Sequence, residues 1–300
     1  MDDRDAVATL DDRLKILLPE EYRDSYESME PKPMGSAGLK YNADGQVAWD
    51  QIWGSFCDLA MAGGPPHKGA LLKPGTESDI NAQFGRYDEV AEEICRGIKL
   101  VTGLRAYVSP TPGWISVTCH GDAMAGWLLR AITMENVAVR RRGSILELPV
   151  SPNFRLEKEI KNVITVIAKT CHYWLGHMPH DQQQAIADLF LALDKESPLI
   201  EPARVTADDD ALAARLAARI QKETGLRTGL PRYPTWLGIE CPSVRLAVWM
   251  MRALVASNVL SRREGQVLFV PVNPATDPKG AIVLNAITHV YRLAEIRCRA

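Results

Sequence analysis

The sequence predicts an α+β fold built from two internally duplicated units that pack about a pseudo-twofold axis. Three observations support this prediction. Residues 103–152 recur without a gap at 225–274, apolar residues in each copy follow helical spacing over one stretch, and short β-prone runs flank a glycine-containing turn. We therefore expect the order helix, loop, helix, two strands, helix and β-hairpin in each unit.

The duplication is visible as a constant offset of 122 residues. It places Trp114 on Trp236, Cys119 on Cys241 and Trp127 on Trp249. Over 50 aligned positions 19 residues are identical, where unrelated sequences of average composition would share about 3. Because tryptophan is rare, two tryptophan pairs in the same register exclude coincidence.

Each copy can be divided into elements from its apolar pattern. The expected elements of the two copies are strands 114–118 and 236–240, helices 122–134 and 243–256, and hairpins 137–140 with 145–150 and 259–262 with 267–272. Polar helices 87–101 and 209–224 precede them, each ending at a glycine that is typical of a helix C-terminus, Gly103 or Gly225.

The wider organisation follows from the same pattern. Apolar helices are expected over 47–62 and 156–174, each followed by a loop that contains histidine and proline. The predicted divisions are an N-terminal arm 1–46, a first repeat 47–153, a second repeat 154–275 and a C-terminal segment 276–300 that carries an amphipathic helix at 281–297.

Composition limits the class of protein. A net charge of −2 over 300 residues supplies no general attraction for a polyanion, so we expect no nucleic-acid partner. No apolar run approaches the roughly 18 residues that a membrane span needs, and the charged start at Met1–Asp5 is unlike a signal peptide. The six cysteines form no CxxC pair, which favours reduced thiols. We expect a soluble, cytoplasmic protein.

Residues that are identical in both copies mainly serve the shared fold. Cys119 and Cys241 each end a strand just before a helix, a position that can lower a thiol pKa. A nucleophile is rarely needed twice, however, and a small buried cysteine suits a strand end. The structural interpretation is therefore favoured over the catalytic one, and the paired tryptophans are interpreted as core anchors.

The hairpins carry a second set of candidates. Arg141 and Arg263 occupy matching positions beside the hairpin turns. Guanidinium groups bind carboxylate and phosphate well, so the two arginines are candidate substrate-binding residues. The alternative is that they are solvated and block pairing of the sheet edge.

The loop 63–69, Gly-Gly-Pro-Pro-His-Lys-Gly, is a candidate catalytic segment. Two prolines would stiffen the backbone that carries His67 and Lys68, which suits acid–base or anion-binding work. A helix end followed by an extended connection explains the same residues. The pattern of a phosphate-binding P-loop is absent.

The segment 171–180 holds the densest chemistry, because three of the six histidines fall within it. Imidazole nitrogens are common zinc ligands, so His172, His177 and His180 are candidate ligands of a zinc-like divalent metal. A metal-free catalytic loop and a polar capping segment remain open. A spacing of five does not align His172 and His177 on one face of an α-helix. Tyr173 and Trp174 are candidate substrate-binding residues beside them.

These residues combine into one hypothesis. If the pseudo-twofold axis brings both histidine loops to a cleft between the repeats, His67 and Lys68 would face His177 and His180, with His120 at the rim. The chain would then be an enzyme acting on a small polar or anionic molecule by histidine acid–base chemistry, with or without a metal.

No nucleotide cofactor motif is present, so hydrolase, lyase or isomerase chemistry fits better than redox chemistry. The alternative is a non-catalytic module, a symmetric cradle that binds a small molecule or a partner. A homodimer is compatible with either.

Overall fold

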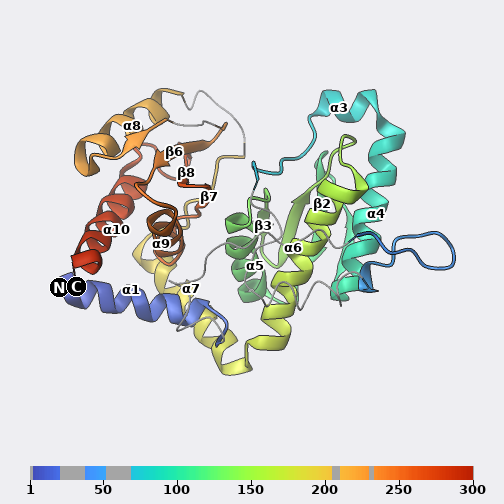
Figure 1. Cartoon of the computed structure of the whole chain (residues 1–300), viewed down its shortest axis with the longest axis horizontal. Helices are drawn as coiled ribbons and strands as arrows, with labels where there is room; N and C mark the ends of the chain where they lie inside the picture. The colour runs from blue at the N-terminus through green and yellow to red at the C-terminus, as the bar shows by residue number, and fades with distance from the viewer. Residues whose placement is uncertain (1–2, 21–37, 52–68, 205–209, 230–232, 300) are drawn as a thin grey trace. The chain divides into compact units, whose positions relative to one another are not determined.

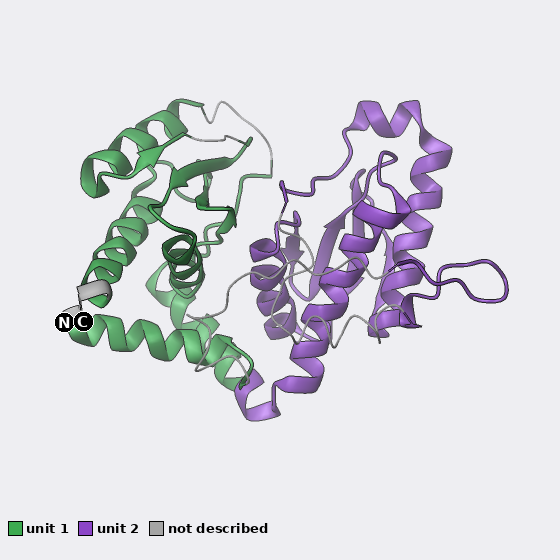
Figure 2. Cartoon of the chain, in the orientation of Figure 1, with its two compact units in different colours: residues 1–27, 184–300 green, residues 28–183 purple. Residues whose placement is uncertain are grey.

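The computed structural model describes residues 3–20, 38–51, 69–204, 210–229 and 233–299 (Figure 1). The chain divides into two compact units, which Figure 2 shows in separate colours. Unit 1 comprises residues 1–27 and 184–300, and unit 2 comprises residues 28–183. His67 and Lys68 lie outside the described residues, so the predicted contribution of their loop stays a prediction.

Unit 2 contains a four-stranded antiparallel sheet with helices packed against it. Its elements are α3 (Glu77–Ala82), α4 (Phe84–Thr102), β1 (Arg105–Val108), β2 (Trp114–Thr118), α5 (Asp122–Met134), β3 (Arg140–Arg142), β4 (Ile145–Pro149), the π-helical turn η2 (Leu156–Ile160), α6 (Lys161–His172) and a second π-helical turn η3 (Tyr173–His177). The strand order is β1-β2-β4-β3.

Unit 1 contains a second sheet with the corresponding strand order, β5-β6-β8-β7. Its elements are α1 (Asp3–Leu17), α8 (Asp210–Thr224), β5 (Arg227–Thr228), β6 (Trp236–Glu240), α9 (Val244–Val255), β7 (Arg262–Glu264), β8 (Val267–Pro271) and α10 (Ala281–Arg299). Helix α7 (His180–Glu196) begins in unit 2 and continues in unit 1.

The α+β class is confirmed, and most predicted elements are present. The predicted strands 114–118 and 236–240 are β2 and β6, and the predicted helices 122–134 and 243–256 are α5 and α9. The first hairpin strands begin later than predicted, at Arg140 and Arg262. The described part of the chain contains no helix that is both long enough and apolar enough to cross a bilayer.

The late start of the hairpins has a backbone cause. Val137 forms a parallel bridge with Leu72, and Val259 forms one with Ile200. Just before them, Asn136 and Asn258 adopt φ values of 60° and 63°. The side-chain amide of Asn136 donates to the carbonyl oxygen of Gly69 at 3.0 Å, and that of Asn258 donates to the carbonyl oxygen of Ser197 at 2.9 Å. A left-handed asparagine therefore anchors an incoming segment at the same place in each unit.

Two predicted helices pack against partners that the sequence did not indicate. The stretch expected as helix 156–174, at the start of the second repeat, forms η2, α6 and η3, and α6 packs against α4 and α5 of unit 2. The predicted C-terminal helix is α10, which packs against α8 and α9. The pairs α4–α6 and α8–α10 thus occupy matching places beside their sheets.

The two faces of the unit 2 sheet differ in chemistry. The register pairs Val117 with Leu146 on one face, and both are fully buried. On the opposite face Ser116 pairs with Glu147, and Glu147 pairs with Arg140 of β3. Each central strand of this sheet thus presents apolar side chains to one face and a buried polar group to the other.

Candidate functional site

The structure brings His172 and His177 together at the end of α6. Their Nε2 atoms lie 2.9 Å apart, and their ring centroids are 4.6 Å apart. The α-helix gives way here to the π-helical turn η3. A π-helix closes its hydrogen bonds over five residues, so it aligns side chains at that spacing, which an α-helix does not. The spacing of five argues against this alignment only within an α-helix, and the helix here changes to π-helical geometry at Tyr173.

The histidine pair lies beside an aromatic and a charged neighbour. The buried Tyr173 ring has its centroid 5.8 Å from that of His177. The Nζ atom of Lys169 lies 5.9 Å from the Tyr173 ring centroid and forms a 3.1 Å ion pair with Glu135. Trp174 is buried and packs on Trp127 at 5.9 Å, so it belongs to the core. Of the two predicted aromatic residues, Tyr173 is the one that contacts the pair.

The contact between the two imidazoles restricts their protonation. One Nε2 must carry a hydrogen and the other must accept it. Two imidazolium ions would present two hydrogens to each other across the same gap, so full protonation breaks the contact. The pair can therefore hold, donate or accept a proton, which is the chemistry of a general acid or base.

Two imidazole nitrogens are also two of the four ligands that a zinc ion commonly takes. Within the described residues, no group of three or more His, Cys, Asp and Glu side chains is placed to hold a metal ion. His180 is exposed at the start of α7. A metal held by His172, His177 and His180 stays a prediction, with two of its three ligands in contact.

The remaining predicted site residues lie elsewhere. His120 is exposed in the turn before α5. Arg141 donates to the carbonyl oxygen of Asp122 at 3.3 Å, and the buried Arg263 donates to that of Gly265 at 3.0 Å. Both guanidinium groups thus bond to turn backbone within their own units.

Cys119, Cys171 and Cys241 are buried thiols, and for Cys119 and Cys241 the sequence favoured this structural interpretation. Burial raises the pKa of Cys119 and of Cys241 to about 12, and it also raises the pKa of Cys171. The strand-end position does not lower these values, because loss of solvent around the thiolate outweighs it. At neutral pH these thiols are protonated and poor nucleophiles.

Each sheet carries an arginine that packs on aromatic rings, a contact that the sequence analysis did not predict. The Cζ atom of Arg140 lies 3.7 Å from the Trp114 ring centroid, and its Nη2 atom lies 3.1 Å from Glu147. In unit 1, Arg262 is fully buried and its Cζ atom lies 4.0 Å from the centroid of Phe269. Alternation along β3 was the available signal, since it directs Arg140 and Arg141 to opposite faces.

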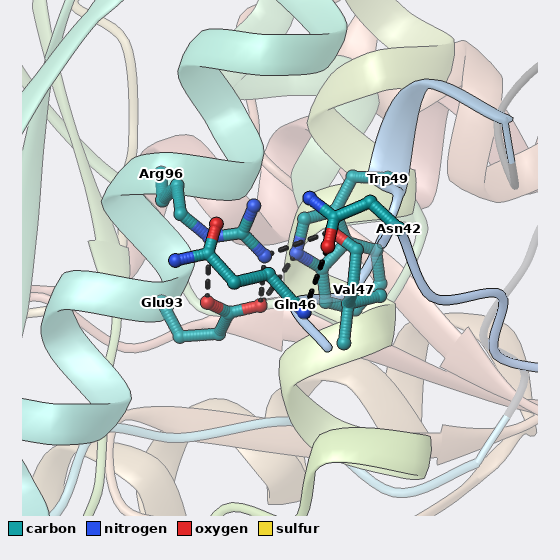
Figure 3. Close-up of polar contacts among 6 residues, drawn as sticks. All are labelled: Asn42, Gln46, Val47, Trp49, Glu93 and Arg96. Atoms are coloured by element: carbon teal, nitrogen blue, oxygen red, sulfur yellow. Dashed lines mark hydrogen bonds and ion pairs between the residues drawn. The ribbon is translucent and has the colours of Figure 1, made fainter. Parts of the chain in front are cut away.

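The segment 40–51 forms a second site that sequence reasoning missed (Figure 3). Trp49 is buried and donates from Nε1 to Glu93 at 2.7 Å. Arg96 bonds to both carboxylate oxygens of Glu93 and to the carbonyl oxygen of Val47 at 2.8 Å. These bonds to Glu93 raise the pKa of Arg96. A small hairpin is thus fixed to α4 by one aromatic side chain and one bridged ion pair.

The contact between segment 40–51 and α4 also depends on a glycine in α4. A Cβ atom at Gly97 would lie 2.3 Å from Cδ1 of Ile164 on α6 and 3.1 Å from Cδ1 of Trp49. Only a residue without a side chain allows all three groups to meet this closely.

No protein-family model, curated protein or solved structure matches this chain.

Proposed function

We propose that the chain is a duplicated, non-catalytic binding module in which the paired helices beside each sheet form the recognition surface. The observation that carries the proposal is the contact between segment 40–51 and α4 of unit 2, which is made through Trp49, Glu93 and Arg96. An aromatic anchor in a desolvated pocket, with a charged pair beside it, is typical of interface hot spots.

Matching backbone geometry supports the duplication. Trp114 pairs with Pro149 and Trp236 pairs with Pro271, at the offset of 122 residues. The similarity extends into the helices that follow, because Asn-x-Ile-Thr occurs at 162–165 in α6 and at 285–288 in α10. The proposed unit therefore runs from α4 to α6 and from α8 to α10. Buried, protonated thiols in both copies fit a structural role for the conserved cysteine pair.

A peptide supplied in trans tests this proposal. The Trp49→Ala variant of the full chain removes the anchor of the hairpin, so a labelled peptide of residues 39–51 should bind it, measured by fluorescence anisotropy. The wild-type chain should bind the peptide at least about tenfold more weakly, because its own segment has a high effective concentration. A peptide with alanine at position 49 is the matched control. Equal binding of both peptides, or none to a variant with native circular dichroism, would contradict the proposal.

A second candidate function is histidine acid–base catalysis on a small polar or anionic molecule. The 2.9 Å contact between His172 and His177 favours it, because such a pair can exchange a proton with a bound substrate. Metal content is the first measurement, on chelator-free protein beside a His177→Ala variant.

A transition metal bound near one per chain, and lost in the variant, would support metal-assisted chemistry. A metal-free protein leaves acid–base catalysis, to be tested with a thermal-shift screen of small anions. Failure of every anion to give a shift that depends on His177 would remove this candidate.

A further inference from the structure

Unit 1 has an open cavity at the place that corresponds to the Trp49 contact of unit 2. The cavity lies between α8 and α10, which pack against each other (Figure 1), and its volume is about 410 Å³. It is open to solvent, and most of the residues that line it are exposed. It is lined by Arg219, Glu223, Leu284, Asn285, Thr288, His289 and Arg292. This volume lies within the range of about 300–1,000 Å³ that is usual for small-molecule sites.

One substitution between the two copies accounts for much of the difference. Gly97 of α4 corresponds to Arg219 of α8 at the offset of 122 residues. In unit 2, the glycine lets the side chains of Ile164 and Trp49 pack directly against α4. In unit 1, a long cationic side chain stands at that position and lines an open cavity. A copy that diverges at the recognition surface while keeping the fold is expected to have acquired a different ligand.

The lining favours an anion. The lining contains two guanidinium groups, Arg219 and Arg292, and the imidazole of His289, but one carboxylate, Glu223. The Nη2 atom of Arg292 lies 3.5 Å from Nδ1 of His289, so these two groups are already drawn together. Guanidinium groups offer pairs of parallel donors that match the oxygens of carboxylate and phosphate.

The neutral part of the lining is also suited to a small polar ligand. Asn285 and Thr288 project from the same helix as Arg292 and add amide and hydroxyl donors. Leu284 is buried and supplies an apolar surface at one side. Arg219 makes one long contact of 3.5 Å, from Nη1 to the carbonyl oxygen of Lys279, which leaves further donors on its guanidinium group.

We propose that the α8–α10 cavity binds the carboxylate or phosphate group of a small molecule, with Arg219 and Arg292 as the principal ligands of the anion. The inference rests on the proposed function, since it names the ligand class for the recognition surface of unit 1. It does not involve the histidine pair of unit 2.

Isothermal titration calorimetry on the full chain tests the proposal, with inorganic phosphate and glutarate as separate probes. The probe that binds identifies whether phosphate or carboxylate is preferred. Arg219→Ala and Arg292→Gln should each weaken its binding about tenfold or more. Arg215→Ala, which removes an exposed arginine of α8 that does not line the cavity, is the control and should leave binding unchanged.

Direct heats are needed because phosphate also stabilises proteins by exclusion from their surface, without a site. The proposal is overturned if neither probe binds, or if Arg215→Ala weakens binding as much as the other two variants. It is also overturned if Arg219→Ala and Arg292→Gln, with native circular dichroism, bind like the wild type. Binding of the 39–51 peptide to Trp49→Ala without anion binding would retain the proposed function and reject this inference alone.

Discussion

Replacement of Glu147 by alanine should strongly destabilise unit 2. The Glu147 side chain is 5% exposed and lies 3.1 Å from Arg140, whose side chain is 16% exposed. Ser109 also donates to Glu147, at 2.6 Å. Removing one partner of a buried ion pair costs about 3–5 kcal/mol, because the other charge is left in a poorly solvated place. Contact with Trp114 still stabilises the guanidinium by roughly 1–2 kcal/mol. We therefore expect a loss of about 1–4 kcal/mol.

The sheet of unit 1 suggests how part of this loss can be recovered. Phe269 stands in unit 1 where Glu147 stands in unit 2, and Arg262 lies over it. Glu147→Phe should give Arg140 a second aromatic contact, so it should be about 1–2 kcal/mol more stable than Glu147→Ala.

Urea unfolding followed by tryptophan fluorescence and circular dichroism measures both variants, with the transition of each unit fitted separately. Glu157→Ala, at an exposed acidic residue of the same unit, is the control and should stay within about 0.5 kcal/mol of wild type. If Glu147→Ala matches this control, the buried ion pair does not stabilise the unit. If Glu147→Phe is no more stable to urea than Glu147→Ala, a second aromatic contact does not stabilise Arg140.

Three further predictions follow from described contacts. Because the folded chain keeps Cys119 and Cys241 protonated up to about pH 12, whereas unfolded thiols ionise near 9, the free energy of unfolding should fall as pH rises above 9. The decrease should reach up to about 1.4 kcal/mol per pH unit for each thiol, and a flat urea midpoint from about pH 8 to about pH 10 would contradict it. Asn136→Ala and Asn258→Ala should each lower the free energy of unfolding by about 2 kcal/mol, because the alanine is strained in the left-handed conformation and a hydrogen bond is lost. Asn136→Gly and Asn258→Gly should lose about half as much in the same unfolding assay, because glycine adopts this conformation without strain. Trp49→Phe should lower stability less than Trp49→Ala, which should cost about 3–5 kcal/mol; equal melting temperatures for the two would show that the ring does not anchor the hairpin.

The local sequence pattern was sufficient to predict the elements that show a clear apolar periodicity along their own length. Strands β2 and β6 and helices α5 and α9 could be predicted because apolar spacing and glycine positions define them without reference to distant residues. Two strands were expected before α5, but the bounds of β1 could not be derived, because Arg105–Val108 is short and lies at the sheet edge without a clear alternation. The place of α6 beside α4 could not be derived, since it depends on contacts between helices that are far apart in the chain.

The candidate sites show the same limit more sharply. The histidine-rich segment was identified from composition, but the π-helical turn that joins His172 to His177 leaves no periodic signature. Trp49 begins a helical turn, as its place in the predicted helix 47–62 indicated, but its bond to Glu93 could not be predicted, because the two residues are 44 positions apart. The α8–α10 cavity required both a known helix pairing and the comparison of Arg219 with Gly97. Chemistry therefore could not be derived where a site is assembled from separate elements.

The division of unit 1 between the two ends of the sequence has a consequence for biosynthesis. Helix α1 packs against α9 and α10, and Arg297 forms an ion pair with Asp11 across 286 residues. Unit 2 is continuous from 28 to 183, so it can fold as soon as it has left the ribosome. Helix α1 emerges before unit 2, yet its partners α9 and α10 are translated after the whole of unit 2. During this interval its apolar face, with Leu10 and Leu14, is exposed, and a chaperone that shields amphipathic helices would find it there.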